Sequence, residues 1–404
     1  MTLERVCDDC GARTTEPVAR CDCGEPLWLA TDPGSFSWDD VSDSPGMWRY
    51  EELLPVEFPG GLAAAAGGTP LLRDDALDEY AGTTVHVKVE GSHPTGSFKD
   101  RGSAVGLAAI ESGLVGDAAA VGTVSHGNMA MSTAAFATAA DVPCVVFVPD
   151  DVPQARLDVI GQFDPTILTV RGEYSRLYDR TLELGPDNDV VFLNSDVPLR
   201  VEGQKTTAVE LCEAFAPEVP DAIVLPVSSG GHASGVWKAV RELHEAGAID
   251  RIPELYLTQA AACSPIADAF ERGDSAVSRV EGGDTIAYSI ANADPPSGTR
   301  ALRAARETGG AVVSVTDDEI RDAQRVLATQ AGLSVETASA TALAGTKQLV
   351  ERGFVDPGDD VAVIATGTGL KESPAEGSHD PLGTVGIDGI DAALGRFLGG
   401  ESGV

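Results

Sequence analysis

The sequence is short of positive charge. Among its 404 residues, 28 are lysine or arginine and 63 are aspartate or glutamate, so the formal net charge is −35. Only six of the basic residues are lysines. A surface this acidic repels phosphate backbones and anionic lipids, which argues against nucleic-acid and membrane partners. The acidic residues are spread through hydrophobically patterned segments, so we expect most of the chain to fold.

Long hydrophobic runs are also missing. No apolar run approaches the roughly 18 residues that a membrane span needs, and the first residues contain no signal-peptide core. We therefore expect a cytoplasmic protein. The acidic composition also resembles that of proteins from salt-rich cytoplasm, where an acidic surface keeps protein soluble. The chain is long enough for two domains and a small appendage.

Cysteine is scarce and unevenly placed. Four of the seven cysteines lie near the N-terminus, as Cys7-x-x-Cys10 and Cys21-x-Cys23, and a glycine follows each pair. Such glycines let backbone amides turn toward thiolate sulfurs, and four thiolates suit a tetrahedral structural zinc. We therefore predict a zinc-ribbon-like knuckle over residues 1–30. The remaining three cysteines, interpreted as buried thiols in apolar surroundings, are Cys144, Cys212 and Cys263.

Two alternatives to a structural zinc remain for the knuckle. The cysteines could form two disulfides or stay free, although a reducing cytoplasm disfavours disulfides. Zinc ribbons also bind nucleic acids or proteins, but this one lacks the basic face expected for nucleic acid.

Strand-like and helical patterns alternate through most of the remaining chain. Short apolar runs typical of buried strands lie at 85–90, 118–122, 144–148, 166–170, 190–193, 222–227, 312–315 and 361–365. Helical patterns lie at 103–110, 129–140, 154–163, 173–184, 233–246, from Asp317 onward and at 389–397. This alternation predicts an α/β fold with parallel sheets covered on both faces, and ligands bound in turns that follow the strands. Residues 31–66, rich in Pro-Gly turn signals, are predicted to be a linker.

The segment 94–102, PTGSFKDRG, has Lys99 at its centre. It follows one of the strand-like runs and precedes a helical one, so we expect Lys99 in a turn that opens onto a helix. Desolvation and the positive field of a helix start both lower a lysine pKa and make the amine a nucleophile. The alternative is an ordinary solvated lysine.

Three further polar segments follow predicted strands. In SHGN (125–128), the Ser125 hydroxyl and nearby amides can bind a carboxylate at a helix start, and Asn128 can donate a hydrogen bond, although the segment could be a simple helix cap. In SSGGH (228–232), successive amides and hydroxyls can bind an anion. In NSDVPLRVEGQKT (194–206), the Arg200 guanidinium suits phosphate, with a surface ion pair as the alternative.

These motifs resemble those of a known family, and they occur in its order from about residue 67 to residue 371. PTGSFKDRG resembles the pyridoxal-phosphate (PLP) lysine motif of threonine synthase and its relatives in fold type II, the tryptophan-synthase-β-like group. Segment 194–206 resembles threonine synthases in particular. The resemblance implies two parallel-sheet, three-layer domains: a large PLP-binding domain of 67–90 and 201–375, and a small domain of 91–200 that carries Lys99. Residues 376–404 are then a C-terminal tail.

The resemblance also implies site roles. Lys99 would hold PLP as a Schiff base and transfer protons, Asn128 would contact the ring hydroxyl, and Thr366, in TGTGLK (366–371), would contact the ring nitrogen. The expected cofactor-binding residues are Lys99, Asn128, Ser228, Ser229, Gly230, Gly231, His232 and Thr366. The expected substrate-binding residues are Ser125, Asn194, Ser195 and Arg200. The expected metal ligands are Cys7, Cys10, Cys21 and Cys23.

The implied reaction is that of a PLP-dependent lyase that converts O-phosphohomoserine and water to threonine and phosphate. Three positions depart from the family pattern: Met129, Ser229 and Thr368 replace a threonine, an asparagine and a histidine. The alternatives are a threonine or serine ammonia-lyase or other β-replacement enzyme of the same fold, and a non-catalytic PLP-fold binding module. The partner we expect is a small amino-acid substrate, and a homodimer is compatible with the sequence.

Overall fold

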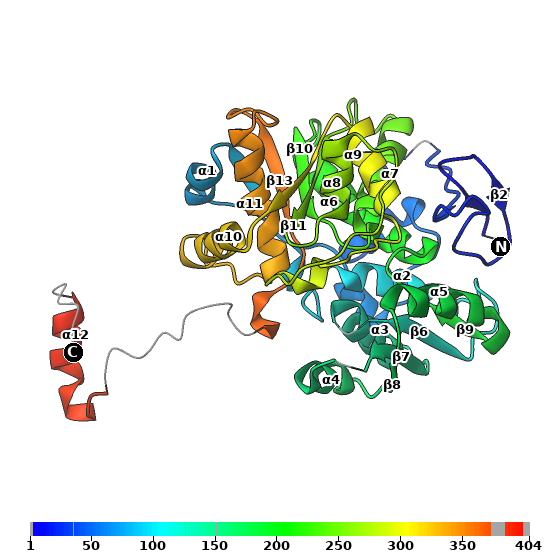
Figure 1. Cartoon of the computed structure of the whole chain (residues 1–404), viewed down its shortest axis with the longest axis horizontal. Helices are drawn as coiled ribbons and strands as arrows, with labels where there is room; N and C mark the ends of the chain where they lie inside the picture. The colour runs from blue at the N-terminus through cyan, green and yellow to red at the C-terminus, as the bar shows by residue number, and fades with distance from the viewer. Residues whose placement is uncertain (1–2, 35, 126, 151, 373–383, 399–404) are drawn as a thin grey trace. The chain divides into compact units, whose positions relative to one another are not determined.

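The computed structural model describes residues 3–34, 36–125, 127–150, 152–372 and 384–398 (Figure 1). The chain forms two compact units, Met1–Glu372 and Ser373–Val404. The second unit contains η8 (Ile387–Gly389) and α12 (Ile390–Leu398), where a helix was predicted at 389–397. Of the predicted tail, residues 376–383 and 399–404 lie outside the described residues.

A six-stranded sheet forms the larger part of the first unit, with strand order β12-β11-β10-β13-β5-β4. Its parallel strands are β5 (Thr84–Val89), β10 (Ala222–Pro226), β11 (Glu254–Ala260), β12 (Val312–Val315) and β13 (Asp360–Ala365). The edge strand β4 (Leu71–Arg73) pairs antiparallel with β5.

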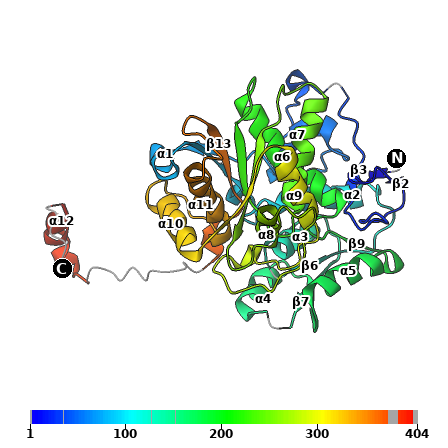
Figure 2. The same ribbon diagram turned by 45° about the horizontal axis from the view of Figure 1, so that its top comes forward.

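Helices cover both faces of this sheet, as predicted. Ile223 and Leu225 of β10 face one core, and Val224 faces the other, because side chains alternate along a strand. The first core contains α6 (Pro198–Phe215), α7 (Gly231–Glu245), α8 (Pro265–Arg272) and α9 (Gly298–Glu307). The second contains α1 (Asp75–Ala81), α10 (Asp317–Thr329) and α11 (Thr337–Glu351), which group around β13 in Figures 1 and 2. The α/β fold class is therefore confirmed.

A second, four-stranded sheet is entirely parallel, with strand order β8-β7-β6-β9. Its strands are β6 (Ala120–Val124), β7 (Cys144–Pro149), β8 (Thr166–Val170) and β9 (Val190–Phe192). The helices α2 (Lys99–Glu111), α3 (Asn128–Ala139), α4 (Gln154–Gly161) and α5 (Tyr174–Leu184) belong to the same stretch of chain. α3 packs on β6 and β7, and α2 packs on α3 and on α6.

The N-terminal residues form a small antiparallel sheet in the order β2-β1-β3. Its strands are β1 (Arg5–Val6), β2 (Arg13–Thr14) and β3 (Trp28–Leu29). This sheet lies beside α7 and α9, where Arg241 and Arg303 form ion pairs with Asp8 (Figure 2).

The segment 31–66, predicted to be a linker, packs into the core of the protein. It contains η1 (Trp38–Asp40), η2 (Gly46–Leu53) and η3 (Gly61–Ala65). Met47 and Trp48 are completely buried, and the Trp48 indole donates to the Ala63 carbonyl at 2.7 Å. The turn signals were interpreted correctly as breaks in regular structure, but the aromatic side chains between them fill the space beside α2.

Short helices occupy several of the remaining connections: η4 (Glu90–Ser92), η5 (Pro186–Asn188), η6 (Tyr288–Ile290) and η7 (Gly369–Lys371). Among the helices of the described ranges, none combines the length and the apolar character needed to cross a bilayer.

Two of the elements that differ from the sequence-based expectation do so for the same reason. α6 was not predicted as a helix, and α2 begins at Lys99 rather than at Ser103. Both helices bury charged side chains, including Glu202 and Lys205 of α6 and Arg101 of α2, all completely buried. Burial of polar positions removes the one-sided apolar pattern by which a surface helix is recognised in a sequence.

One of the isolated cysteines also differs from its predicted environment. Cys212 and Cys263 are buried, as predicted, whereas Cys144 at the start of β7 is only half-buried.

The charges buried at the contact of α2 with α6 neutralise one another. The Arg101 guanidinium donates to both oxygens of Glu90, at 2.7 and 2.8 Å, and to both oxygens of Glu210, at 2.7 and 2.8 Å. Burial alone would raise the pKa of both carboxyls, but the charge of Arg101 outweighs it and holds both pKa values well below the usual range. This pairing fixes α2, and Lys99 at its start, against α6.

Replacing Arg101 should therefore be strongly destabilising. Arg101→Met leaves Glu90 buried without the guanidinium that pairs with it and leaves Glu210 with Lys88, 2.7 Å away, as its remaining ion-pair partner, which costs about 3–5 kcal/mol in the free energy of unfolding. Urea unfolding at fixed salt measures this loss. Arg325→Met is the matched control, because Arg325 forms an exposed ion pair with Asp322 and should change stability little. Equal effects of the two substitutions would contradict the role given to the buried pair.

Candidate active site

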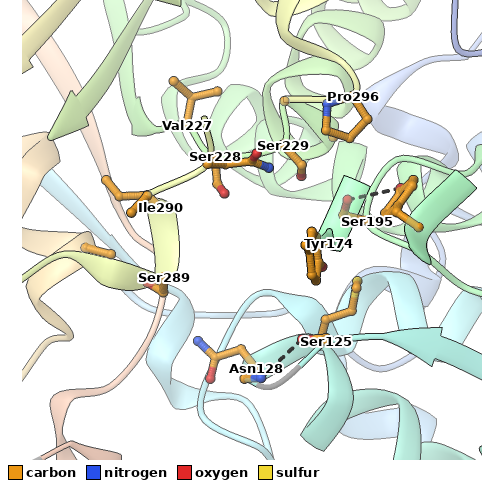
Figure 3. A pocket seen from close by; sticks show the side chains of 18 of the residues that line it. Ser125, Asn128, Tyr174, Ser195, Val227, Ser228, Ser229, Ser289, Ile290 and Pro296 are labelled. Carbon is orange, nitrogen blue, oxygen red and sulfur yellow. Dashed lines mark hydrogen bonds between the residues drawn. The ribbon is translucent and has the colours of Figure 1, made fainter. Parts of the chain in front are cut away.

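A cavity of about 610 Å³ lies where strands of both sheets end. Pro149 at the end of β7, Pro226 at the end of β10 and Thr366 directly after β13 all line it. Figure 3 shows Ser228 and Ser229 on one side of the cavity and Ser125 and Asn128 on the opposite side. A cavity at the carboxyl ends of the strands is where a parallel sheet is expected to bind its ligand.

Lys99 lies on the cavity wall as the first residue of α2. The turn before it is bonded to the segment that follows β13: Phe98 N donates to Thr366 O at 3.0 Å, and Thr368 N donates to Gly96 O at 2.9 Å. An isolated bridge also joins Ser97 to Gly367. The lysine is therefore held by backbone bonds from the end of the central strand, and its side chain opens to the cavity.

The surroundings of Lys99 favour its neutral amine. Burial, and then the nearby positive charge of Arg200, lower the pKa of Lys99 to about 7, while Glu336 opposes the change. The face of the Phe98 ring, whose centroid lies 4.2 Å from Nζ, is a contact that favours the ammonium form instead. An amine with this pKa can give and accept a proton near neutral pH.

Arg200, which the resemblance assigns to substrate phosphate, lies beneath Lys99 and not on the cavity wall. Its side chain is completely buried, and Nε donates to the Leu193 carbonyl at 3.0 Å. Its terminal nitrogens donate to the Lys99 carbonyl, the Ser103 hydroxyl and the Thr133 hydroxyl, at 3.2, 3.3 and 2.8 Å. Burial lowers the pKa of Arg200 to about 10. In this arrangement the charge of Arg200 contributes to the lowered pKa of Lys99, and Arg200 is not among the residues that line the cavity.

A glycine brings Arg200 this close to α2. A Cβ atom added to Gly102 would lie 2.4 Å from Cγ of Arg200, nearer than real Cβ contacts allow. Packing therefore explains why Gly102 ends the motif PTGSFKDRG: the absent side chain lets the Arg200 side chain pass directly under the start of the helix.

The loop 228–232 forms the wall of the cavity that lies opposite Ser125 and Asn128 (Figure 3). Gly230 has a left-handed backbone (φ 88°), and a Cβ on Gly231 would lie 2.1 Å from the Ser195 carbonyl oxygen. The loop leads into α7, whose first backbone N–H groups have no partners within the helix. The sequence predicts an anion at this position, next to amides that have no partner within the helix.

His232 adds an unpaired polar atom to this loop. Its Nε2 lies 3.1 Å from the Thr207 hydroxyl, whereas Nδ1 is buried with no hydrogen-bond partner among the described residues. Burial lowers the pKa of His232 to about 3, so the imidazole is neutral. If Nε2 accepts from Thr207, Nδ1 carries the proton and can donate to a ligand in the cavity.

Asn128 lies on the wall below this loop, in contact with two charged residues. Its amide nitrogen donates to the Glu336 carboxylate at 2.8 and 2.9 Å, and Lys371 donates to its amide oxygen. Lys371 Nζ also lies 3.2 Å from Glu336. Asn128 is therefore at the predicted wall with a fixed side-chain orientation, while His126 of the same motif lies outside the described residues.

Thr366 reaches the cavity at the end of β13, as expected from its position in the sequence. Its hydroxyl is 2.9 Å from the hydroxyl of Ser339, which also accepts from Gly367 N at 2.9 Å. A neutral hydroxyl at this position can bond to a ring nitrogen without supplying a charge.

The predicted substrate residues divide into two groups. Ser125 and Ser195 line the cavity (Figure 3). Asn194 is completely buried behind the wall, where it accepts from Val124 N at 3.0 Å and donates to the Thr181 hydroxyl at 3.0 Å. Asn194, like Arg200, supports the cavity from outside.

Several lining residues were not predicted from the sequence. Tyr174 and Tyr178 lie one helical turn apart on α5, a spacing that the sequence shows but that is equally typical of core packing. Arg279 and Tyr288 come from an irregular segment with no periodic signal. Arg279 forms an ion pair with Glu173 at 3.2 Å, and both line the cavity.

The four N-terminal cysteines come together as predicted. Their sulfur atoms all lie within 4.8 Å of one another, with Cys7 to Cys23 and Cys10 to Cys21 at 3.6 Å. These distances are far too long for disulfides, and all four are free thiols. A tetrahedral zinc with bonds of about 2.3 Å places its sulfurs about 3.8 Å apart, so the cluster has the dimensions of a zinc site.

A comparison with protein families defines the class of this chain. A family profile described as pyridoxal-phosphate dependent enzyme matches residues 62–367. The matched residues include Lys99, the loop 228–232 and Thr366. The chain therefore belongs to the pyridoxal-phosphate-dependent enzymes.

Curated relatives narrow the class. The chain is 35% identical to the threonine synthase of Methanocaldococcus jannaschii over 390 residues, which cover 93% of this chain and 95% of the relative. It is 36% identical to that of Methanosarcina acetivorans over 375 residues, 91% of each chain, and 32% identical to that of Halalkalibacterium halodurans over 336 residues, 80% of this chain and 90% of the relative. Within its class, the chain belongs to the threonine synthase family.

Solved structures agree on the fold. The processed form of threonine deaminase isoform 2 from Solanum lycopersicum matches with a TM-score of 0.63 and 18% identity, over 84% of this chain and 94% of its own. Serine racemase from Dictyostelium discoideum matches with a TM-score of 0.62 and 24% identity, over 74% of this chain and 92% of its own. These neighbours confirm fold type II.

The positive charge of Arg200 near Lys99 leads to a prediction about how PLP attachment depends on pH. Attachment of PLP to the cofactor-free protein requires the neutral amine, so its rate should rise with pH through a midpoint near 7, set by the lowered pKa of Lys99. Arg200→Gln removes a positive charge that favours the neutral form, so the midpoint should move to higher pH. At pH 7, attachment should slow on the order of tenfold for each unit of that shift.

The control is Arg180→Gln, because Arg180 forms an exposed pair with Glu183. Stopped-flow absorbance from pH 6 to 10 measures the rates. An unchanged midpoint in Arg200→Gln would show that Arg200 does not set the state of Lys99.

Proposed function

We propose that this protein is a threonine synthase that converts O-phosphohomoserine and water to threonine and phosphate. The observation that carries the proposal is the position of Lys99: an amine with a pKa near 7 on the wall of the cavity, in a chain whose curated relatives are threonine synthases along most of its length. The chain's own residues support each requirement of this reaction.

The cavity fits PLP. Its volume of about 610 Å³ lies in the range of small-molecule sites, and the glycines of the loop 228–232 let this loop pack closely against the Ser195 and Ser297 carbonyl oxygens. We assign the cofactor phosphate to this loop, where the unpaired Nδ1 of His232 is available. We assign the ring hydroxyl to Asn128, the ring nitrogen to Thr366 and the aldehyde carbon to the Lys99 amine.

PLP, when bound, supplies an electron-withdrawing ring that stabilises negative charge next to the amino group of a substrate. Lys99 provides the acid and base. Its lowered pKa lets it remove a proton from the α carbon, move a proton at the β carbon, and return protons while phosphate leaves from Cγ and water adds at Cβ. The hydroxyl of Thr366 leaves the ring nitrogen without a counter-charge, which favours elimination and replacement over transamination.

Polar groups on the remaining wall suit the substrate. Ser125 and Ser195 present hydroxyls, and the Tyr178 hydroxyl lies 3.2 Å from that of Ser195. Arg279, from the irregular segment that lines the cavity, adds a positive charge to this wall. We therefore assign substrate binding to Ser125 and Ser195, and we assign Asn194 and Arg200 to the support of this wall.

The decisive assay measures both products. The PLP-loaded enzyme should release phosphate from O-phosphohomoserine with an equal amount of threonine. Lys99→Ala should lower kcat by a factor of about 10³, because the variant loses the acid-base group. Lys347→Ala is the control, because this lysine packs over Tyr80, outside the residues that line the cavity.

An ammonia-lyase of the same fold would give the opposite result. It would form a 2-oxo acid from threonine or serine and release no phosphate from O-phosphohomoserine. That outcome would replace the synthase assignment but retain the cofactor. A protein with no turnover of either substrate would support the non-catalytic alternative.

We further propose that Cys7, Cys10, Cys21 and Cys23 bind a structural zinc. Gly11 and Gly24, which follow the two pairs, have left-handed backbones (φ 73° and 94°), and Gly11 N donates to Cys7 O at 2.9 Å. These are the turns that direct amides toward thiolate sulfurs. A sheet of two-residue strands buries too little to fold alone, so the metal would supply much of its stability.

Metal analysis tests the zinc site. The parent protein, produced with zinc in the medium, should contain one zinc per chain, and Cys7→Ser should lose most of it and show faster proteolysis within residues 1–30. Cys144→Ser, outside the cluster, should retain the metal. A parent without zinc, or full retention in Cys7→Ser, would contradict the site.

We also propose the domain division expected from the sequence. All strands of the six-stranded sheet come from 67–90 and 201–375, and all strands of the four-stranded sheet come from 91–200, which supports these boundaries.

A cytoplasmic location fits the thiol state of the cysteines, and the net charge of −35 supports adaptation to a salt-rich cytoplasm.

A further inference from the structure

We propose that Arg20, in the N-terminal cysteine knuckle, is a positioning residue for the active site. Through the buried carboxylate of Asp196, it holds Ser195 and Tyr178 in place on the cavity wall. This inference rests on the proposed function, because it concerns the same cavity. It makes the knuckle a structural part of the amino-acid site rather than a separate appendage.

The contact is direct. Nη2 of Arg20 lies 2.9 Å from Oδ2 of Asp196. The Asp196 side chain is 1% exposed, and that of Arg20 is 24% exposed. An ion pair at this depth is poorly screened by solvent, and removing one partner leaves the other charge buried without compensation. The arginine is therefore the counter-charge that allows a carboxylate to stand behind the cavity wall.

Asp196 joins three parts of the protein. It accepts hydrogen bonds from the Tyr178 hydroxyl on α5 and from the Ser297 hydroxyl, the latter at 2.7 Å, in addition to its bond with Arg20. Burial alone would raise the pKa of Asp196, but Arg20, followed by the hydroxyls of Tyr178 and Ser297, lowers it below its usual value. The carboxylate is thus kept ionised as an acceptor.

The connection with Tyr178 reaches the cavity on the substrate side. Tyr178 lines the cavity, and its hydroxyl is 3.2 Å from that of Ser195, which lies on the wall in Figure 3. Because Asp196 directly follows Ser195, a shift of its carboxylate moves both the serine and the tyrosine.

The connection with Ser297 reaches the loop 228–232. Ser297 N donates to the Ser229 carbonyl at 2.8 Å. A Cβ on Gly231 would lie 2.1 Å from the Ser195 carbonyl oxygen and 3.1 Å from Cα of Asp196. The substrate wall and the anion-binding loop therefore share a tight contact at Asp196, with little room to adjust independently.

The knuckle sets the position of Arg20. Arg20 directly precedes Cys21 and forms an isolated bridge with Pro26. The Pro26 carbonyl accepts from Arg300 on α9, and the Asp8 carboxylate next to Cys7 pairs with Arg241 and Arg303. The fold of the cysteine turns and their attachment to α7 and α9 thus aim Arg20 at Asp196.

The test measures binding of L-threonine, which either a synthase or an ammonia-lyase of this fold would bind. Titration of the PLP-loaded protein, followed by the initial change in cofactor absorbance before product forms, gives an apparent Kd for either enzyme. Arg20→Gln should raise this Kd and the KM for O-phosphohomoserine by about tenfold, equivalent to about 1.4 kcal/mol, with a smaller change in kcat and unchanged cofactor content. Arg20→Lys should restore part of the affinity.

Two comparisons separate positioning from a general loss of stability. Arg13→Gln, which breaks the exposed pair of Arg13 with Glu4 in the same knuckle, should leave the Kd unchanged. In a double-mutant cycle, Arg20→Gln combined with Asp196→Asn should bind threonine no more weakly than the weaker single variant, because both remove the same interaction.

A third variant tests the role of the knuckle itself. Cys21→Ser should reproduce the higher Kd of Arg20→Gln, because it disturbs the turn that aims the arginine.

The proposal is overturned if Arg20→Gln binds threonine as the parent does and changes only the melting temperature, or if the two substitutions in the cycle act additively. An unchanged Kd in Cys21→Ser beside a raised Kd in Arg20→Gln would remove the knuckle from the proposal. A parent that binds threonine but releases no phosphate from O-phosphohomoserine would disprove the synthase and leave the test of Arg20 intact.

Discussion

The active site depends on the burial of the Lys99 amine and on the charge of Arg200, whose guanidinium donates to the Lys99 backbone carbonyl and helps to lower the pKa of the amine. Two other completely buried cations are paired with acids: Arg101 lies between two glutamates, and Lys205 contacts Glu202 and Glu242. Arg200 instead donates to carbonyl and hydroxyl oxygens, so its charge remains effective at the neighbouring amine. A carboxylate in its place would stabilise the ammonium form of Lys99 and remove the nucleophile. The fold thus uses the same residue type for stability in one place and for chemistry in another.

The close contact between α2 and α6 makes this arrangement possible. Gly102 admits the Arg200 side chain, and a Cβ on Gly203 would lie 2.1 Å from the Arg101 carbonyl oxygen. The buried cluster of Arg101 with Glu90 and Glu210 holds the two helices at this distance. The turn before Lys99 is in turn bonded to the end of β13. Stability and reactivity are therefore coupled through a few backbone contacts, because the turn that carries Lys99 is bonded to the segment after the central strand β13.

The rest of the cavity follows from the ends of the parallel strands. The segments after β6, β10 and β13 deliver backbone amides, hydroxyls and an amide side chain to one place, and Asp196 is bonded to both Tyr178 on the cavity wall and Ser297 beside the loop 228–232. The N-terminal knuckle reaches the same point through Arg20. Membership in the threonine synthase family and the chemistry of the wall agree, because a cavity with a near-neutral amine, an anion-binding loop and uncharged hydroxyls suits elimination and hydration of a phosphorylated amino acid.

The sequence alone determined the features that depend on neighbours along the chain. Strand-turn-helix order predicted the parallel sheets, and Lys99, Asn128, the loop 228–232 and Thr366 lie on one cavity because each follows a strand or opens a helix. The paired cysteines predicted their own cluster for the same local reason. Only the tertiary structure decided the partners of buried charges. Arg200 and Asn194 belong to a recognisable motif, yet both are buried behind the cavity wall. The helix α6 buries ion pairs and therefore lacks a one-sided apolar pattern. The segment 31–66, predicted to be a linker, contributes residues to a hydrophobic core. Whether a charged side chain faces a ligand, a carboxylate or another cation depends on residues distant in the chain, and no local pattern encodes that choice.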